Sequence, residues 1–141
     1  MAEFTAIALQ TVEAGQNVLF TETPVPSFNG QVLHRQGSGV VDLRGVTNQC
    51  RARYKVTFGG NIAISAGGTV DPISIAIALQ GEPLASATAI VTPAAVGDFY
   101  NVFVAVFVEV PRCCCLSVAV ENTSGQAIDV QNANLIVERV A

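Results

Sequence analysis

The chain has 141 residues, of which half are hydrophobic and 13% are charged, with seven Lys or Arg against eleven Asp or Glu. A net charge of −4, a single Lys and no basic cluster beyond Arg51, Arg53 and Lys55 argue against nucleic-acid binding. No apolar run approaches the roughly 18 residues of a membrane-spanning helix, so no membrane insertion is expected. The apolar surplus instead predicts one domain, residues 1–141, that is partly buried by oligomerisation.

The first half of the chain predicts short strands with turns between them. Pro24-Val25-Pro26 is expected to interrupt ladder pairing, because proline has no amide proton to donate. Asn29-Gly30 is a strong signal for a two-residue turn, and Gly37-Ser38-Gly39 predicts a hairpin between its flanking strands. The strands expected here are residues 4–9, 17–20, 32–35, 40–44, 51–58 and 62–64.

The second half continues the same pattern. The clearest alternation runs from Ile73 to Gln80, where the isoleucines and Leu79 are expected to point inward and the alanines outward. The strands expected here are residues 73–80, 84–91, 100–110, 113–121, 128–130 and 134–140. About ten short strands at ~8–12-residue spacing favour an all-β, antiparallel sandwich or barrel.

The strand expected at Tyr100–Val110 organises the rest of the chain. Every second residue is Val, and the residues between them include Phe103, Ala105 and Phe107, with Glu109 as the one carboxylate. Because strand side chains alternate between two faces, both faces of this strand are apolar. One face needs a core inside the subunit. The other needs a second cover, for which another copy of the chain is the simplest source.

Three segments resemble bacterial members of the C1q/TNF-like jelly-roll superfamily. Arg53–Phe58 is similar to their central Tyr-Lys-Ile-Thr strand, and Ile75–Leu84 to their strand-turn-strand around Val-Asn-Gly-x-Pro. Asn134–Ala141 resembles the closing strand of the collagen-like exosporium glycoprotein of Bacillus spores. The order and spacing of these segments agree with the family from about Gly45 to the C-terminus.

The resemblance implies an antiparallel jelly-roll β-sandwich that assembles as a compact homotrimer. In that family the strand corresponding to Tyr100–Val110 belongs to the sheet nearest the threefold axis. The chain departs from the family because it has no collagen-like Gly-x-y repeat, and its N-terminus shows no signal peptide. We therefore expect a stalkless head, made in the cytoplasm, that suits a phage virion or a bacterial or spore surface.

The pattern of the strand at Tyr100–Val110 also predicts which side meets the partner. An uninterrupted row of Val is typical of a sheet face packed on a second sheet, so Val104 and Val106 are expected in the core. Glu109 is costly in a core but tolerable at an interface rim. The resemblance implies that the Arg51, Arg53 and Lys55 side of a neighbouring strand lies on the same face, so Glu109 is expected to pair with one of these cations across the subunit boundary. The residues expected in the trimer interface are Phe103, Phe107, Glu109, Arg53 and Lys55.

The thiols are the most conspicuous reactive group, Cys50 and the run Cys113-Cys114-Cys115. The run lacks the CxxC spacing and the partner ligands of a structural zinc site, although a threefold axis could gather one Cys from each subunit. We expect the three cysteines of the run to pack in the sandwich as small apolar residues. The alternative is a disulfide, which would need the strand of Cys50 to lie beside the run.

Other candidates for chemistry are sparse. His34 is the sole histidine, so one subunit offers no multi-His metal site, and the residue is expected to be solvated in its hairpin. The Asp residues are scattered at turns without the Asp-x-Asp-x-Asp pattern of a calcium loop. No metal and no cofactor are therefore expected.

The sequence favours a non-enzymatic structural protein, a homotrimer that decorates or attaches to a larger particle, with other structural proteins of that particle as partners. The alternative is an adhesion head that binds a receptor or a surface glycan. An enzyme is a third hypothesis, and it is the weakest of the three because no general base is placed beside a nucleophile.

Overall fold

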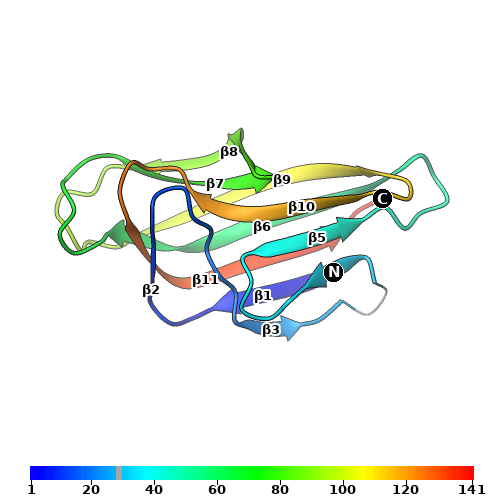
Figure 1. Ribbon diagram of the computed structural model, residues 1–141, viewed down its shortest axis with the longest axis horizontal. Coiled ribbons are helices and arrows are strands. Elements are labelled where there is room, and N and C mark those ends of the chain that lie inside the picture. The colour runs from blue at the N-terminus through cyan, green and yellow to red at the C-terminus, as the bar shows by residue number, and fades with distance from the viewer. Residues whose placement is uncertain (28–29) are drawn as a thin grey trace.

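The computed structural model describes residues 1–27 and 30–141, and the regular elements in that part of the chain are all β-strands (Figure 1). They form two antiparallel sheets that face each other, which confirms the predicted all-β sandwich. Nothing in the described ranges forms a helix long and apolar enough to cross a membrane. The turn expected at Asn29-Gly30 lies outside the described residues, because Asn29 is not among them.

The first sheet has six strands in the order β3-β1-β11-β6-β9, with β2 paired to the first residues of β11. Its strands are β1 (Ala2–Ala6), β2 (Gln10–Val12), β3 (Glu22–Val25), β6 (Arg51–Ile64), β9 (Tyr100–Pro111) and β11 (Ile128–Arg139). The long ladder between β6 and β9 runs from Arg51 opposite Pro111 to Ile62 opposite Tyr100. Strand β9 therefore forms one edge of this sheet.

The second sheet has five strands in the order β4-β5-β10-β7-β8. Its strands are β4 (Val32–His34), β5 (Val40–Arg44), β7 (Ile73–Leu79), β8 (Glu82–Val91) and β10 (Cys115–Asn122). The hairpin predicted around Gly37-Ser38-Gly39 joins β4 to β5. The chain passes between the two sheets after β3, β5, β6, β8, β9 and β10, which is the connectivity of a jelly roll.

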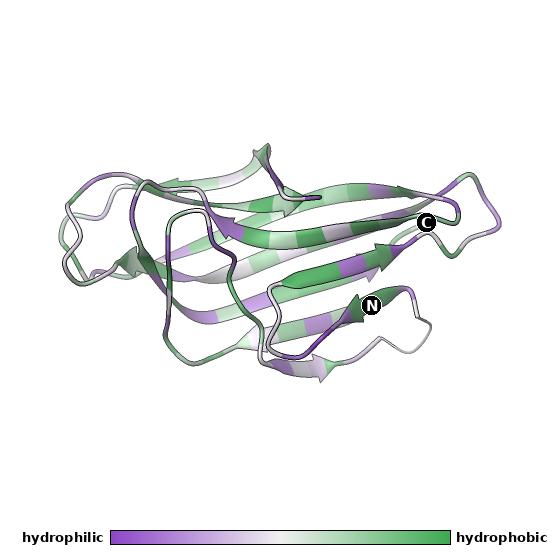
Figure 2. Cartoon of the chain, viewed as in Figure 1, coloured by the Kyte–Doolittle hydropathy of each residue, from purple (hydrophilic) through white to green (hydrophobic). Residues whose placement is uncertain are grey.

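Inward-facing apolar side chains of both sheets fill the space between the layers, and hydropathy alternates along the strands accordingly (Figure 2). Tyr54 also ties the layers together, because its hydroxyl donates to the carbonyl oxygen of Arg44 at 2.6 Å. Burial raises the pKa of Tyr54, so the phenol stays protonated and remains a donor. The largest fully buried side chains are Tyr54, Phe20, Phe58, Leu43, Ile62, Ile64, Ile73, Ile75 and Ile77.

Strand β9 pairs with β6 alone, so the strand around which the sequence pattern is organised lies at a sheet edge. Its Val residues point into the sandwich: Val104 is 8% exposed, Val108 is 2% exposed, and Val106 is partly buried against the core. The alternate row faces away from the core. The structure therefore places the Val row in the core, as the pattern predicts.

Two pairs of expected strands are each one continuous strand. Strand β6 runs through Gly59-Gly60 because β11 passes close beside it, and a Cβ added at Gly60 would lie 3.3 Å from the Cα of Ala133. Strand β11 runs past an irregular register at Asn132, whose φ is 55°. These Gly and Asn residues permit a close approach and a bulge, whereas the sequence pattern predicts breaks between strands at both places.

The N-terminal expectations are the least accurate. Residues 17–20 form only an isolated bridge at Asn17, and β1 ends at Ala6. Pro24 lies inside β3 although its segment is expected to be unpaired. Strand β3 is the outermost strand of its sheet, and its register with β1 is irregular, so a residue without an amide proton is tolerated there.

The alanines of β7 also depart from the expected pattern. Ala76 and Ala78 are buried together with the isoleucines, although alternation predicts them on the outer face. Strand β7 lies between β10 and β8, and so small a side chain between two neighbouring strands leaves little area for solvent to reach. Alternation of polarity therefore underestimates the burial of this strand.

Asn122 is the one polar side chain that is fully buried among the described residues, and we predict that Asn122→Ala destabilises the fold. Its Nδ2 donates to the carbonyl oxygens of Val12 and Gln126, each at 2.9 Å, and its Oδ1 accepts from the amide of Ser124. Truncation leaves two carbonyls without a donor, so the free energy of unfolding should fall by about 1–3 kcal/mol in a chemical denaturation experiment.

The matched control for this variant is Asn48→Ala, at an exposed loop position. A surface change of this kind should alter the free energy of unfolding by less than about 0.5 kcal/mol. Equal losses of the free energy of unfolding in the two variants would show that the hydrogen bonds of Asn122 do not stabilise the fold.

Candidate functional site

The most unusual surface of the sandwich is the outward side of β6 and β9. Because the two strands pair in register, Phe107 lies opposite Lys55 and Glu109 lies opposite Arg53. We call this surface the β6–β9 face, and its members are Arg51, Arg53, Lys55, Phe103, Phe107 and Glu109. The five residues expected in the trimer interface thus lie together on one surface, although the sequence does not show that β6 and β9 are neighbours.

The apolar part of this face is exposed to an unusual degree. Phe103 and Phe107 are 67% and 62% exposed. The residue of β6 opposite Phe103 is Gly59, which has no side chain to cover the ring. Burying one such side chain fully is worth about 1.5–3 kcal/mol, so the face gains free energy from any partner that covers it.

The apolar surface continues from β9 onto the neighbouring edge of the second sheet. Strand β8 contacts β9 where the two sheets meet. Ile90 of β8 is 71% exposed, and Phe99 and Tyr100 at the start of β9 are 42% and 38% exposed. An edge of the sandwich as well as a face is therefore available to a partner.

The charged part of the face centres on Glu109, which binds two arginines of its own chain. Arg51 Nη1 lies 2.6 Å from Oε2, and Arg53 Nη2 lies 2.7 Å from Oε1. These hydrogen bonds, foremost that from Arg51, hold the pKa of Glu109 below its usual range and raise the pKa of Arg51. The ion pairs expected across a subunit boundary form within one chain instead, because the ladder places β6 directly beside Glu109.

Two shallow hollows flank Glu109. The first, of 310 Å³, is lined by Arg53, Phe107 and Glu109, and the second, of 240 Å³, by Cys50, Arg51, Glu109 and Pro111. Each combines an apolar wall with a guanidinium group. Such a surface suits a protruding side chain of a protein partner, which can place its apolar part on the ring and its polar end at the arginine.

Cys50, Cys113 and Cys114 lie on neighbouring loops and Cys115 begins the strand that follows, and all four are exposed thiols without disulfide bonds. Cys113 and Cys114 belong to the turn between β9 and β10, Cys113 has a φ of 64°, and Cys115 begins β10. The interpretation of the run as packed core residues is wrong, because the chain has left the first sheet before the run begins. The carbonyl oxygen of Cys50 accepts from the amide of Arg112 at 3.0 Å, so Cys50 does lie beside the run.

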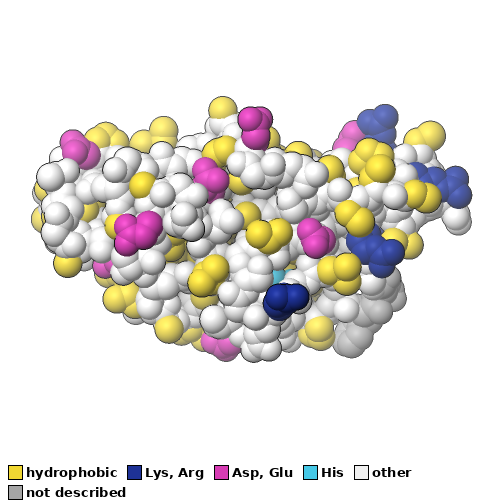
Figure 3. All heavy atoms as spheres, in the orientation of Figure 1, with side chains coloured by type: hydrophobic (Ala, Val, Ile, Leu, Met, Phe, Trp, Pro, Cys, Tyr) yellow, Lys and Arg dark blue, Asp and Glu magenta, His cyan; other side chains and the backbone are white. Residues whose placement is uncertain are grey.

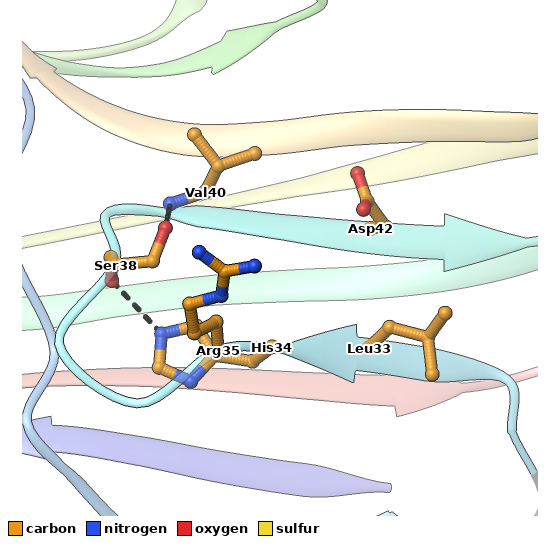
Figure 4. Close-up of a pocket in the computed structure, with 6 residues that line it drawn as sticks. All are labelled: Leu33, His34, Arg35, Ser38, Val40 and Asp42. Carbon is orange, nitrogen blue, oxygen red and sulfur yellow. Dashed lines mark hydrogen bonds between the residues drawn. The ribbon is translucent and has the colours of Figure 1, made fainter.

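His34 lies beside a hollow of 440 Å³ at the β4–β5 hairpin, with Arg35 and Asp42 on its wall (Figure 4). The ring is half-buried where a solvated one is expected, because Phe4 of the opposite sheet packs on it with 4.5 Å between ring centroids. Its Nε2 lies 2.8 Å from the carbonyl oxygen of Ser38, and its buried Nδ1 has no hydrogen-bond partner among the described residues.

His34 stabilises the β4–β5 hairpin and is not paired with a nucleophile. The group that contacts the imidazole is the backbone carbonyl of Ser38, whereas the hydroxyl of Ser38 accepts from the amide of Val40 at 3.1 Å. In the part of the chain that the structure describes, no three His, Cys, Asp or Glu side chains converge as metal ligands would.

Comparisons with known proteins give a fold and no family. No protein-family model matches the sequence, and the curated proteins contain no match. Among solved structures, the Eiger TNF from S. frugiperda is 15% identical, with a TM-score of 0.71 over 99% of this chain and 91% of that one. The globular domain of the zebrafish complement 1qA protein is 11% identical, with a TM-score of 0.53 over 96% and 94%.

A third solved structure is more distant. The C-terminal domain of EclA, a sugar-binding protein, is 14% identical, with a TM-score of 0.42 over 94% of this chain and 80% of that one. Taken with the strand order, the first two likenesses show that the chain has a C1q/TNF-like jelly-roll fold. The fold implied by the three resembling segments is thus confirmed, and the function has to be argued from the β6–β9 face.

We predict that Glu109→Gln lowers stability only at pH values where the carboxylate is charged. Arg51 and Arg53 depress the pKa of Glu109 from its ordinary value of 4.5. The ionised group therefore stabilises the folded state above that value, and this stabilisation is lost as the pH falls through the folded-state pKa.

Chemical denaturation should accordingly show a small loss of stability for Glu109→Gln at pH 7 and none well below pH 4.5. Glu22→Gln is the control, at an exposed carboxylate of the edge strand β3. A difference from the wild type that stays constant across this pH range would contradict the role assigned to the ion pairs.

We also predict that replacing Cys113, Cys114 and Cys115 together by Ser leaves the melting temperature unchanged, because all three side chains are exposed. A metal chelator should likewise have no effect on thermal unfolding of the wild type. A large fall with the chelator would reveal a bound metal, since a structural metal contributes its binding free energy to folding.

Proposed function

We propose that the chain is a non-enzymatic structural protein that forms a homotrimer through its β6–β9 face, and that the trimer decorates or attaches to a larger particle such as a phage virion or a spore surface. The observation that carries this proposal is the exposure of Phe103 and Phe107, 67% and 62%, on a strand whose other face is packed in the core. Exposed aromatic side chains gathered on one surface are typical of protein interfaces.

The charged residues of the face are compatible with burial at the rim of such an interface. Glu109 already has two arginines as partners in its own chain, so covering it costs less than covering an unpaired carboxylate. Lys55 lies opposite Phe107, where its aliphatic stem can pack along the ring while its ammonium group stays in water. The face therefore combines an apolar centre with a polar rim.

Another copy of the same chain is the partner favoured here. A C1q/TNF-like resemblance implies a compact trimer, and the fold agrees with that resemblance over nearly the whole chain. The exposed β8–β9 edge offers a second apolar surface on the same molecule, which is what a closed ring of copies requires when one copy's edge covers its neighbour's face. The particle and the relation to the exosporium glycoprotein belong to the proposal through the resemblance of the three segments alone.

An adhesion head is the second candidate, and the hollow at the β4–β5 hairpin favours it. This hollow lies on the second sheet, away from the β6–β9 face, and places Arg35, His34 and Asp42 around a space of 440 Å³. It would stay open in the proposed trimer. Binding of isolated trimers to a glycan array would favour this candidate, whereas docking on a capsid or spore lattice would favour the structural role.

Assembly is the direct test of the proposed function. Sedimentation at micromolar concentration should give the mass of a trimer. A monomer mass would contradict the proposal, and a dimer mass would keep the β6–β9 face as an interface while discarding the threefold symmetry.

Variants on the two faces of β9 identify the surface that assembles. Phe107→Ala should weaken the assembly, with each subunit losing on the order of 3 kcal/mol of buried aromatic contact. Phe107→Asp should give folded monomers, since carboxylates would meet in an apolar interface. Val108→Asp is the matched change on the other face, and it should unfold the subunit because Val108 is 2% exposed. A soluble, fully trimeric Phe107→Asp variant would show that another surface forms the interface.

A further inference from the structure

Charge is divided between the two ends of the long axis. Figure 3 shows most of the visible Lys and Arg side chains at the right-hand end, one near the middle beside the histidine, and none toward the left-hand end. Six of the seven cations of the chain belong to this right-hand end, which is built from the end of β5, the start of β6, the β9–β10 turn and the end of β11. We call it the basic end, and its cations are Arg44, Arg51, Arg53, Lys55, Arg112 and Arg139.

Hydrogen bonds hold these segments together. The guanidinium of Arg139 donates to the carbonyl oxygen of Val46 at 2.8 Å, and the amide of Arg112 donates to that of Cys50 at 3.0 Å. The carboxylates of the same segments are Asp42, Glu109 and Glu138, so six cations and three anions leave the basic end a net side-chain charge of +3.

The opposite end carries carboxylates and, among the described residues, no cation. It is formed by the β6–β7, β8–β9 and β10–β11 connections and the segment after β2. The amide of Gly97 donates to Ile64, and the side chain of Gln126 bonds to Thr69, which brings these loops together. We call this the acidic end. Its carboxylates are Glu13, Asp71, Asp98, Glu121 and Asp129, a net charge of −5.

We propose that the basic end of one molecule docks on the acidic end of the next, so that copies stack head to tail along the long axis. One molecule carries both a guanidinium-rich surface and a carboxylate-rich surface, and the net charges of the two ends are opposite in sign. Guanidinium and carboxylate groups form paired hydrogen bonds that fix orientation as well as attract. The contact joins unlike ends, so it leaves both outer ends free and can repeat.

This stacking goes beyond the proposed homotrimer and does not depend on it. The trimer forms through the β6–β9 face on the side of the sandwich, whereas the basic end and the acidic end lie at opposite ends of its long axis. Arg44, Arg112 and Arg139 lie outside the β6–β9 face and stay available when that face is covered. If three copies associate side by side in parallel, the basic end presents three copies of Arg44, Arg112 and Arg139 to the next layer, which strengthens the attraction between successive layers.

The thiols provide a reporter for this contact. All four cysteines are exposed, and all belong to the segments of the basic end, with none at the acidic end. A partner docked on the basic end must shield them from a neutral alkylating reagent such as iodoacetamide. The rate of alkylation therefore reads out contact at this particular end.

The experiment compares the protein at low and high salt. At about 10 mM salt, where the Debye length is roughly 30 Å, light scattering should show assemblies heavier than the unit present at about 0.5 M salt. Alkylation of the thiols should slow several-fold under the same low-salt conditions, and both effects should reverse on adding salt. A single mass at both salt concentrations, or equal alkylation rates, would overturn the proposal.

Charge-reversal variants locate the contact. Arg112→Glu at the basic end and Asp98→Lys at the acidic end should each reduce low-salt stacking, and a one-to-one mixture of the two should restore it because each retains one unaltered end. Arg35→Glu is the control, since it makes the same change in net charge at the hairpin between the ends. Equal loss with the control, or stacking of Arg112→Glu like the wild type, would overturn the proposal.

The homotrimer and the head-to-tail stacking are tested by different measurements, so either can be contradicted without the other. The mass at high salt tests the trimer, whether or not the units stack. The growth of that unit at low salt tests the stacking, whether the unit is a trimer or a monomer.

Discussion

Strand β9 has a single ladder neighbour, β6, and the register between them places Arg53 opposite Glu109 and Lys55 opposite Phe107. Because side chains alternate with period two, this register sends the Val row into the sandwich and the Phe row out of it. A slip by one residue would bury Glu109 and expose the valines. The identity of the exposed surface therefore depends on this ladder more than on any other interaction in the molecule.

The jelly-roll connectivity has a second consequence, at the ends of the sandwich. Each crossing between the sheets happens at an end, so segments remote in the chain meet there. Arg44, Arg112 and Arg139 come from three such segments. The thiols come from two, with Cys50 in the β5–β6 loop and the Cys113–Cys115 run at the β9–β10 turn and the start of β10. The sides of the molecule thus carry its apolar surface, while the ends carry most of its charge and all of its thiols.

The candidate site could be predicted in part because strand periodicity is a local property. The pattern within Tyr100–Val110 is sufficient to separate Phe103 and Phe107 from the valines. It does not reveal the partner of Glu109, which depends on which strand lies alongside and in which register. The same limit explains the thiols. The local pattern predicts that Cys113 and Cys114 lie in a strand, and only the tertiary structure shows that the chain leaves the sheet before them. Likewise, the local sequence predicts a solvated His34, and only the tertiary structure places Phe4 of the other sheet on its ring.

By itself the sequence determined the all-β class, most strand positions after residue 30, and the division of β9 into two faces, since these follow from alternation, β-branched residues and turn chemistry. The tertiary structure alone decided that Gly59-Gly60 continues a strand, that Glu109 is neutralised within its own chain, and that the cations collect at one end. Each of these depends on contacts between segments far apart in the chain, here β6 with β9 and β11 and the β5–β6 loop with the β9–β10 turn. Local patterns carry no record of such pairings, because the same side-chain alternation is compatible with many strand orders.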